Sequence, residues 1–447
     1  MEIQSQNMTE GSLAKKILLF SIPLMFSNVL QVLFNMADVA VIGRFSGAQA
    51  LGAVGSTPIL VTLFTGFLIG MGNGVNVVTS RYFGAKKDKQ VLETVHSSVI
   101  ICFITGVVLL IIGVTTSRLL LELLNTKEEL IDMASLYLRI YFLGMPALAM
   151  YNCGSGIMSA VGNTKKPLYY LIIAGIINVV LNLFFVIVVG MSVDGVAIAS
   201  IISQYISAIL IMRALLTSNT SFGIKLDKLK LKKDKAAAVI KIGVPTGLQY
   251  AIFAFANLVI QAAVNSFDVV MVEGNAAAAN SDALVYDVMA AVYTACTSFI
   301  GQNFGAGKKK RIFKTYIICM AYSFIIGAFL GMLLEIFGKQ FLALFTTEPA
   351  VREAGMERLR IMGFSYAVSA FMDSAISAAR GLGKSLIPTI IVVLGSCVFR
   401  IVWVYTIFAV FGTITSLYLL YIFSWALTAC AAIIYFIMCC RKVPETT

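Results

Sequence analysis

Twelve long apolar runs dominate this sequence, and each is long enough to cross a membrane. A spanning helix needs about 20 apolar residues, and 59% of the residues here are hydrophobic while 13% are charged. This composition excludes a soluble enzyme, a disordered chain and a fibrous repeat. The runs also lack the alternation of β-barrel strands. The sequence therefore predicts an all-α membrane protein, with spans near 17–43, 50–78, 91–114, 133–160, 167–189, 194–216, 238–265, 276–301, 312–337, 356–380, 386–410 and 412–438.

Lys and Arg are distributed unevenly among the loops. If the N-terminus is cytoplasmic, 25 of the 34 fall in cytoplasmic segments and eight fall outside, with Arg400 inside a span. Short basic loops stay on the cytoplasmic side of a membrane. We therefore expect both termini in the cytoplasm, and the compact loops favour a bacterial inner membrane. The net charge of +12 reflects these loops, so we expect no nucleic-acid partner. We expect the chain to contact the surrounding membrane lipids.

One pattern occurs twice along the chain. Arg81–Lys87 resembles Gln302–Lys308, and Gly162–Pro167 resembles Gly383–Pro388 after the same interval. The interval between matching segments is the same for two motifs that lie far apart in the chain. This constant interval indicates an internal duplication, with six spans in each copy. Because six is even, both copies enter the membrane from the same side. The repeats are then parallel, related by a pseudo-two-fold axis along the membrane normal, with substrate bound between them.

The duplication divides the chain into two lobes. We expect an N-lobe at 1–216, a polar cytoplasmic linker at 217–237 and a C-lobe at 238–447. Pro23 and Pro245 occupy equivalent places in the first span of each copy. Proline inside a helix removes a hydrogen bond and kinks it, so Pro23 is either a static kink or a hinge.

No motif for ATP hydrolysis or metal-dependent catalysis is evident. Gly381–Ser385 resembles the end of a phosphate-binding loop, but Ala378 replaces the first glycine and no strand precedes it. His96 is the only histidine, and no CxxC pair exists. Transport energy would therefore come from an ion gradient, with H⁺ or Na⁺ as coupling ion and no other cofactor. An intramembrane enzyme is the alternative from another class, and a lipid-product assay would detect it.

Four polar residues within the N-terminal spans could form an ion site. Asp38 lies in the first span, where burial favours the neutral acid and a bound cation favours the carboxylate. Asn178 and Asn182 are four residues apart, hence on one helical face, and Ser200 lies in the next span. Their oxygens suit Na⁺ or a hydrogen-bond relay to a protonated acid. The alternatives are a structural aspartate and asparagines that only join helices.

The C-terminal spans carry three ionisable residues, Asp287, Asp373 and Arg400. A buried arginine needs an acidic partner, which either aspartate could supply. Two interpretations follow from these residues. Either an aspartate forms a structural ion pair with Arg400, or its carboxylate binds a cation or the substrate.

The chain resembles the multidrug and toxic compound extrusion (MATE) family of secondary antiporters. The resemblance covers nearly the whole chain and rests on a set of short segments. These are Ile22–Leu24, Asp38–Gly43, Ala160–Thr164, Gly301–Gly307 and Arg380–Gly383. It implies twelve helices in two lobes and efflux of organic cations in exchange for H⁺ or Na⁺.

The resemblance also assigns site residues. It places the family's ion site on Asp38, Asn178 and Asn182, with a hydroxyl on Ser200 and the first-span proline on Pro23. Two departures matter. Phe253 stands where one branch has a glutamate, and Asn182 stands where some relatives have a second aspartate. No established role falls on Asp287 or Asp373.

The leading hypothesis is a cation-coupled multidrug antiporter that works as a monomer by alternating access. The alternative is a lipid-linked oligosaccharide flippase of the same superfamily, which would carry more basic residues in its cavity. A major-facilitator transporter is disfavoured because Ser80–Gly84 lacks the expected acidic and basic cluster.

The charge asymmetry predicts the location of the C-terminus. A reporter fused after Val443 should be active only in the cytoplasm, because even-numbered spans return the chain to its starting side. Activity of the same fusion in the periplasm would contradict the topology.

Overall fold

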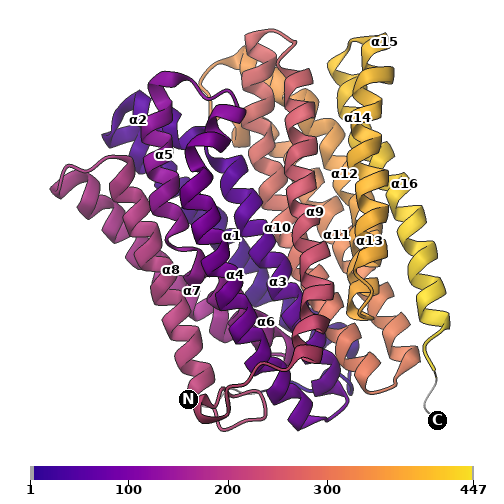
Figure 1. Cartoon of the computed structure of the whole chain (residues 1–447). Helices are drawn as coiled ribbons and strands as arrows, with labels where there is room; N and C mark the ends of the chain where they lie inside the picture. The colour runs from indigo at the N-terminus through magenta and orange to yellow at the C-terminus, as the bar shows by residue number, and fades with distance from the viewer. Residues whose placement is uncertain (1–4, 445–447) are drawn as a thin grey trace. The chain divides into compact units, whose positions relative to one another are not determined.

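The computed structural model describes residues 5–444, and every regular element among them is helical (Figure 1). The first half contains α1 (Leu13–Phe45), α2 (Gly47–Gly55), α3 (Pro58–Gly84), α4 (Asp88–Leu123), α5 (Glu128–Phe142), α6 (Met145–Ala160), α7 (Lys165–Leu183) with the π-helix η1 (Phe184–Val188), α8 (Val193–Leu216) and the short η2 (Leu226–Lys228). The second half contains α9 (Lys233–Val264), α10 (Val269–Gly305), α11 (Lys309–Leu342), α12 (Pro349–Gly381), α13 (Leu386–Val392), η3 (Val393–Val398), α14 (Phe399–Trp403), η4 (Val404–Phe408), α15 (Ala409–Phe411) and α16 (Ile414–Arg441).

These helices account for all twelve predicted spans. Ten helices within the described residues are long and apolar enough to cross a membrane, and the pair α5 and α6, bent by 46°, makes an eleventh. The remaining predicted span, 356–380, corresponds to α12, whose 33 residues suffice in length but whose apolar stretch is interrupted by serines and Asp373. Those polar residues are buried against other helices, so they do not face lipid. The prediction of an all-α membrane protein is confirmed.

The helices pack into two units whose boundaries differ from the predicted lobes. Unit 1 comprises residues 5–7 and Phe26–Ala251, and unit 2 comprises Met8–Met25 and residues 252–444. The first part of α1 thus packs with the second half of the chain, and the first part of α9 packs with the first half. The predicted boundaries at 216 and 238 miss this exchange of helix segments between the units. One helix can pack against both units along its length without any interruption of its apolar pattern.

Unit 1 depends on close approaches between glycines. A Cβ added to Gly70 of α3 would lie 2.3 Å from the backbone nitrogen of Gly247 in α9. A Cβ on Gly156 of α6 would lie 2.5 Å from the carbonyl oxygen of Gly72 in α3. Small residues allow membrane helices to pack backbone to backbone. Glycines therefore set the spacing of α3, α6 and α9.

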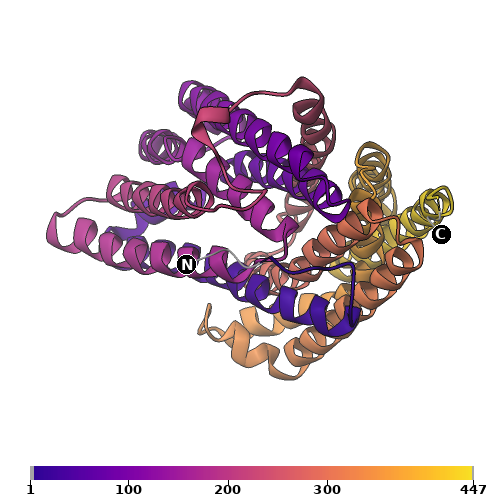
Figure 2. The ribbon, with the colours of Figure 1, turned by 90° about the horizontal axis from the view of Figure 1, so that it is seen from below.

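In unit 2, α12 contacts α10, α11 and α16, and the residues before α1 are held by the repeated motif. The backbone N–H of Met8 donates to Gln302 Oε1 at 3.1 Å, and Asn303 Nδ2 donates to the Met8 carbonyl at 3.3 Å. Arg311 Nη1 donates to the carbonyl of Gly11 at 3.1 Å. In Figure 2 this segment is the indigo coil that leads into α1. The motif at Gln302–Lys308, together with Arg311, thus holds the segment Met8–Gly11.

The repeated motifs end helices in both halves. Gly162 and Gly383 follow α6 and α12 with φ of +90° and +76°. Lys86 and Gly307 follow α3 and α10 with φ of 55° and 70°. A left-handed residue is a common helix terminator, which explains why the duplication is visible at these turns.

The linker between the halves is bound rather than free. The His96 ring on α4 accepts a hydrogen bond at Nε2 from the Lys225 N–H (3.1 Å), and its Nδ1 contacts the Lys228 carbonyl (3.0 Å). The Lys232 N–H donates to Ser97 Oγ at 2.9 Å. Two adjacent α4 side chains, His96 and Ser97, therefore fix the path of the segment predicted to be a polar linker.

Enlarging Gly70 should destabilise unit 1. Gly70→Val places its Cβ against backbone atoms of Gly247, which can move only if α9 shifts. We therefore expect the free energy of unfolding to fall by about 1–3 kcal/mol. The measurement is the thermal midpoint of purified protein in detergent. Gly55→Ala is the matched control, since its Cβ would meet nothing within 4 Å. Equal midpoints for both variants would contradict the packing argument.

Candidate functional site

The four polar residues predicted as an ion site meet in unit 1. Asn182 Nδ2 donates to Asp38 Oδ1, and Ser200 Oγ donates to Asp38 Oδ2 at 3.0 Å. Asn178 Nδ2 lies 3.4 Å from Ser200 Oγ, and Asn182 Nδ2 lies 3.3 Å from Asn178 Oδ1. The contacts close a ring through all four side chains, which come from α1, α7 and α8.

Local sequence explains why the helices meet here. Asn178 and Asn182 are one turn apart on α7 and present both amides to α1 and α8. Gly175 lies one turn before Asn178, and a Cβ there would fall 1.8 Å from the ring of Phe34. Phe34 is itself one turn before Asp38 on α1. The missing side chain at Gly175 therefore lets α1 approach α7 closely enough for Asp38 to reach Asn182.

The ring of contacts is largely withdrawn from solvent. Asn178, Asn182 and Ser200 are 5%, 0% and 7% exposed, and Asp38 is half-buried. Such polar groups inside a membrane span are costly unless they contact one another.

The residues offer what a proton or a hard cation requires. The ionised carboxylate accepts hydrogen bonds from an amide and a hydroxyl, and the same hydroxyl can accept from the neutral acid. Asn182 Oδ1 is buried with no hydrogen-bond partner. Together with Asp38 and Asn178 it supplies oxygen atoms of the kind that Na⁺ prefers. The chemistry of this donor set fits either coupling ion.

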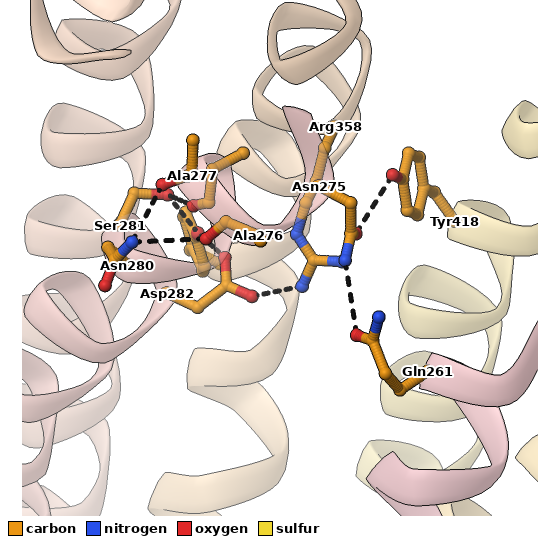
Figure 3. Close-up of polar contacts among 11 residues, drawn as sticks. Gln261, Asn275, Ala276, Ala277, Asn280, Ser281, Asp282, Arg358 and Tyr418 are labelled. Atoms are coloured by element: carbon orange, nitrogen blue, oxygen red, sulfur yellow. Dashed lines mark hydrogen bonds and ion pairs between the residues drawn. The ribbon is translucent and has the colours of Figure 1, made fainter. Parts of the chain in front are cut away.

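Unit 2 contains a second polar cluster that the sequence analysis missed (Figure 3). Arg358 of α12 is 4% exposed and forms an ion pair with Asp282 of α10. Its Nη1 also donates to Asn275 Oδ1 at 2.8 Å, which accepts from the Tyr418 hydroxyl at 3.0 Å. Tyr366 donates to the other oxygen of Asp282. The cluster joins α10, α12 and α16.

Arg358 is one of the eight basic residues counted outside the membrane, although it lies at the start of the predicted span 356–380. Helical periodicity could have identified it. Arg358 shares the buried face of α12 with Ala354, Met362 and Ser365, whereas Arg360 points away and is exposed. A charged residue on an otherwise apolar face needs an internal partner, and Asp282 is that partner.

The structure places the three predicted C-terminal residues in unit 2 without an ion pair at Arg400. No carboxylate of the described residues lies within 4.0 Å of its nitrogens. Arg400 Nε instead donates to Ser424 Oγ at 3.1 Å. Asp373 is 7% exposed. Asp287 lies half-buried on α10.

Pro23 lies within α1, which continues as one helix from Leu13 to Phe45. The residues up to Met25 belong to unit 2 and those from Phe26 belong to unit 1. The helix therefore passes from one unit to the other two residues after its proline.

These features define a multi-pass helical membrane protein with two related halves. A profile of the MatE family matches residues 23–184 and, a second time, residues 245–406. The chain belongs to the MatE family. Each match begins at a proline, Pro23 or Pro245, which confirms that the halves are copies of one pattern.

Named relatives support drug export as the activity of this family. The probable multidrug resistance protein YpnP of Bacillus subtilis is 29% identical over 87% of this chain and 88% of its own length. The probable multidrug resistance protein NorM of Thermotoga maritima is 25% identical over 84% and 82%. An outward-facing multidrug resistance MATE transporter has the same fold, with a TM-score of 0.92 and 20% identity over 100% of both chains. The twelve-helix, two-lobe layout predicted here fits that fold.

The contact between Asp38 and Asn182 should be measurable as a coupling energy. In a double-mutant cycle, Asp38→Ala and Asn182→Ala should be non-additive by about 0.5–3 kcal/mol in the free energy of unfolding. The measurement is equilibrium unfolding in mixed micelles. Asp38→Ala combined with Asn280→Ala is the control, since Asn280 is exposed and its amide donates to carbonyls of its own helix. Additive effects in the first cycle would show that the two side chains do not interact.

Proposed function

We propose that this chain is a secondary active antiporter that exports organic cations in exchange for H⁺ or Na⁺ across the cell membrane. The observation that carries the proposal is the ring of contacts around Asp38. It joins one carboxylate to two amides and one hydroxyl within helices that cross the membrane. No ATP-binding motif offers another energy source.

The coupling step follows from the chemistry of Asp38. As an anion, Asp38 holds α1 against α7 and α8 through Asn182 and Ser200. Binding of H⁺ or Na⁺ neutralises the carboxylate and changes the balance of these bonds. A ligand shifts a conformational equilibrium by its differential affinity for the two states. Loading of the site would thus favour a different position of α1 relative to α7 and α8.

Pro23 supports a hinge in the same helix. The Pro23 nitrogen cannot donate to the carbonyl one turn earlier, so α1 is less stiff there. Movement of the Asp38 end of α1 could then occur while the part before Pro23 stays with unit 2. The two ends of one helix would connect ion binding in unit 1 to the movement that releases the drug.

The direct test is efflux of a fluorescent organic cation from proteoliposomes under H⁺ and Na⁺ gradients imposed separately. Asp38→Asn should fold normally but lose at least about tenfold in gradient-driven efflux, because an amide cannot bind and release a proton or neutralise Na⁺. The matched control is Asp88→Asn, an exposed residue at the start of α4. The gradient that drives wild-type efflux identifies the coupling ion.

Full activity of Asp38→Asn would refute the proposed coupling site. A folded wild-type protein without any gradient-driven efflux would favour the lipid-linked oligosaccharide flippase instead, and lipid-linked substrates would then be assayed. The buried bases Arg358 and Arg400 are the feature of this chain that bears on that alternative.

A further inference from the structure

Arg400 is a buried cation with unused hydrogen-bonding capacity. It lies on α14 and is 2% exposed. Its Nε donates to Ser424 Oγ, but its Nη2 is buried with no partner. A guanidinium carries five N–H donors, and isolated buried charges are costly. A membrane protein that keeps such a group has a use for the donors that remain.

Three aromatic rings surround this guanidinium. The Arg400 Cζ lies 4.6 Å from the ring centre of Tyr421, 5.5 Å from Trp425 and 5.6 Å from Phe253. Cation–π contacts of this kind partly replace the lost hydration of a cation. They stabilise the charge but do not neutralise it. The rings also form an apolar platform on which a flat organic molecule can stack.

The acidic residues of unit 2 leave Arg400 without a contacting counter-charge. Asp282 is occupied, since it accepts from Arg358 and from the Tyr366 hydroxyl. Asp373 does not reach ion-pair distance, and its Oδ2 has no hydrogen-bond partner. Arg358 also stacks on the Tyr421 ring, 5.3 Å from its centre. Two guanidiniums therefore share one aromatic side chain.

We propose that Arg400, Tyr421 and Trp425 form a binding site in unit 2 for the carboxylate or phosphate group of an aromatic organic anion. The anion would accept hydrogen bonds from Arg400 Nη2 while its apolar part lies against the rings. Arginine suits planar oxyanions because its donors are arranged as a fork. The inference rests on the proposed transport function in one respect. Because Arg400 is almost fully buried, the anion must enter in another conformation of the transport cycle.

The same geometry disfavours organic cations at these rings. Tyr421, Trp425 and Phe253 would otherwise form an aromatic cage for a cation, but Arg400 already occupies it. Removal of the Arg400 charge should therefore weaken anion binding and strengthen cation binding at this place. A purely structural arginine would change stability without this reciprocal effect.

Trp425 provides a local readout of binding. The chain has two tryptophans, so Trp403→Phe leaves Trp425 as the only indole. Protein in a non-ionic detergent without anionic lipid is titrated with 2-naphthoate, with 1-naphthyl phosphate and with the cation ethidium. We expect saturable quenching by at least one anion. Comparison of the carboxylate with the phosphate identifies the preferred group.

Variants of Arg400 and its neighbour decide the outcome. Arg400→Gln should weaken anion binding by about ten- to one-hundredfold and strengthen ethidium binding. If that variant fails to fold, Arg400→Lys, which keeps the charge but loses the fork, should show a smaller loss, as should Ser424→Ala. Anion affinity unchanged in the folded variants, or no saturable quenching in wild type, would overturn the proposal.

The two proposals fail separately. Asp38→Asn lies in unit 1 and should leave anion quenching of Trp425 intact even where gradient-driven efflux is lost. Anion binding without any gradient-driven efflux would refute the antiport and keep the site. Gradient-driven cation efflux without anion binding would refute the anion site and keep the antiport.

Discussion

The structure depends on one constraint: a polar group inside the hydrocarbon core must find its partner within the protein. The constraint explains why Asp38 is tied to Asn182 and Ser200, and why Arg358 is paired with Asp282. It also explains the backbone-to-backbone contacts, such as Gly70 with Gly247, since packing replaces the hydrophobic driving force between helices in lipid. Each polar cluster holds together helices that are distant in sequence, so the same contacts that satisfy charges also define the fold.

The two halves share a pattern but not a charge distribution. Unit 1 concentrates one carboxylate among neutral amides and hydroxyls, which is suited to reversible binding of a small cation. Unit 2 concentrates guanidiniums on aromatic rings, with Arg358 and Arg400 both at Tyr421. After duplication the halves kept their turns, where Gly162 and Gly383 adopt left-handed conformations. Their interiors diverged in charge, with a carboxylate bonded to an amide and a hydroxyl in unit 1 and two guanidiniums beside one aromatic ring in unit 2.

Much of this organisation was predictable from sequence, and the failures have clear causes. Twelve spans and the duplication follow from apolar runs and turn motifs, because both are local signals. The meeting of Asp38, Asn178 and Asn182 was predictable because they interrupt apolar helices, where polar residues are conspicuous. That they bind an ion stays a prediction. Arg358 was missed because it lies among surface charges and its burial depends on the face of α12. The exchange of helix segments between units was missed because it is a tertiary property that leaves no mark on hydropathy.

The central claim is that Asp38 is the group that gains and loses charge during transport. Infrared difference spectroscopy of the purified protein tests it directly, since a protonated carboxyl has a C=O stretch distinct from that of a carboxylate. A protonated-acid band should appear as pH is lowered, disappear when the coupling cation displaces the proton, and be absent in Asp38→Asn. Persistence of the band in Asp38→Asn, with loss in Asp373→Asn, would contradict the account and place the titrating group in unit 2.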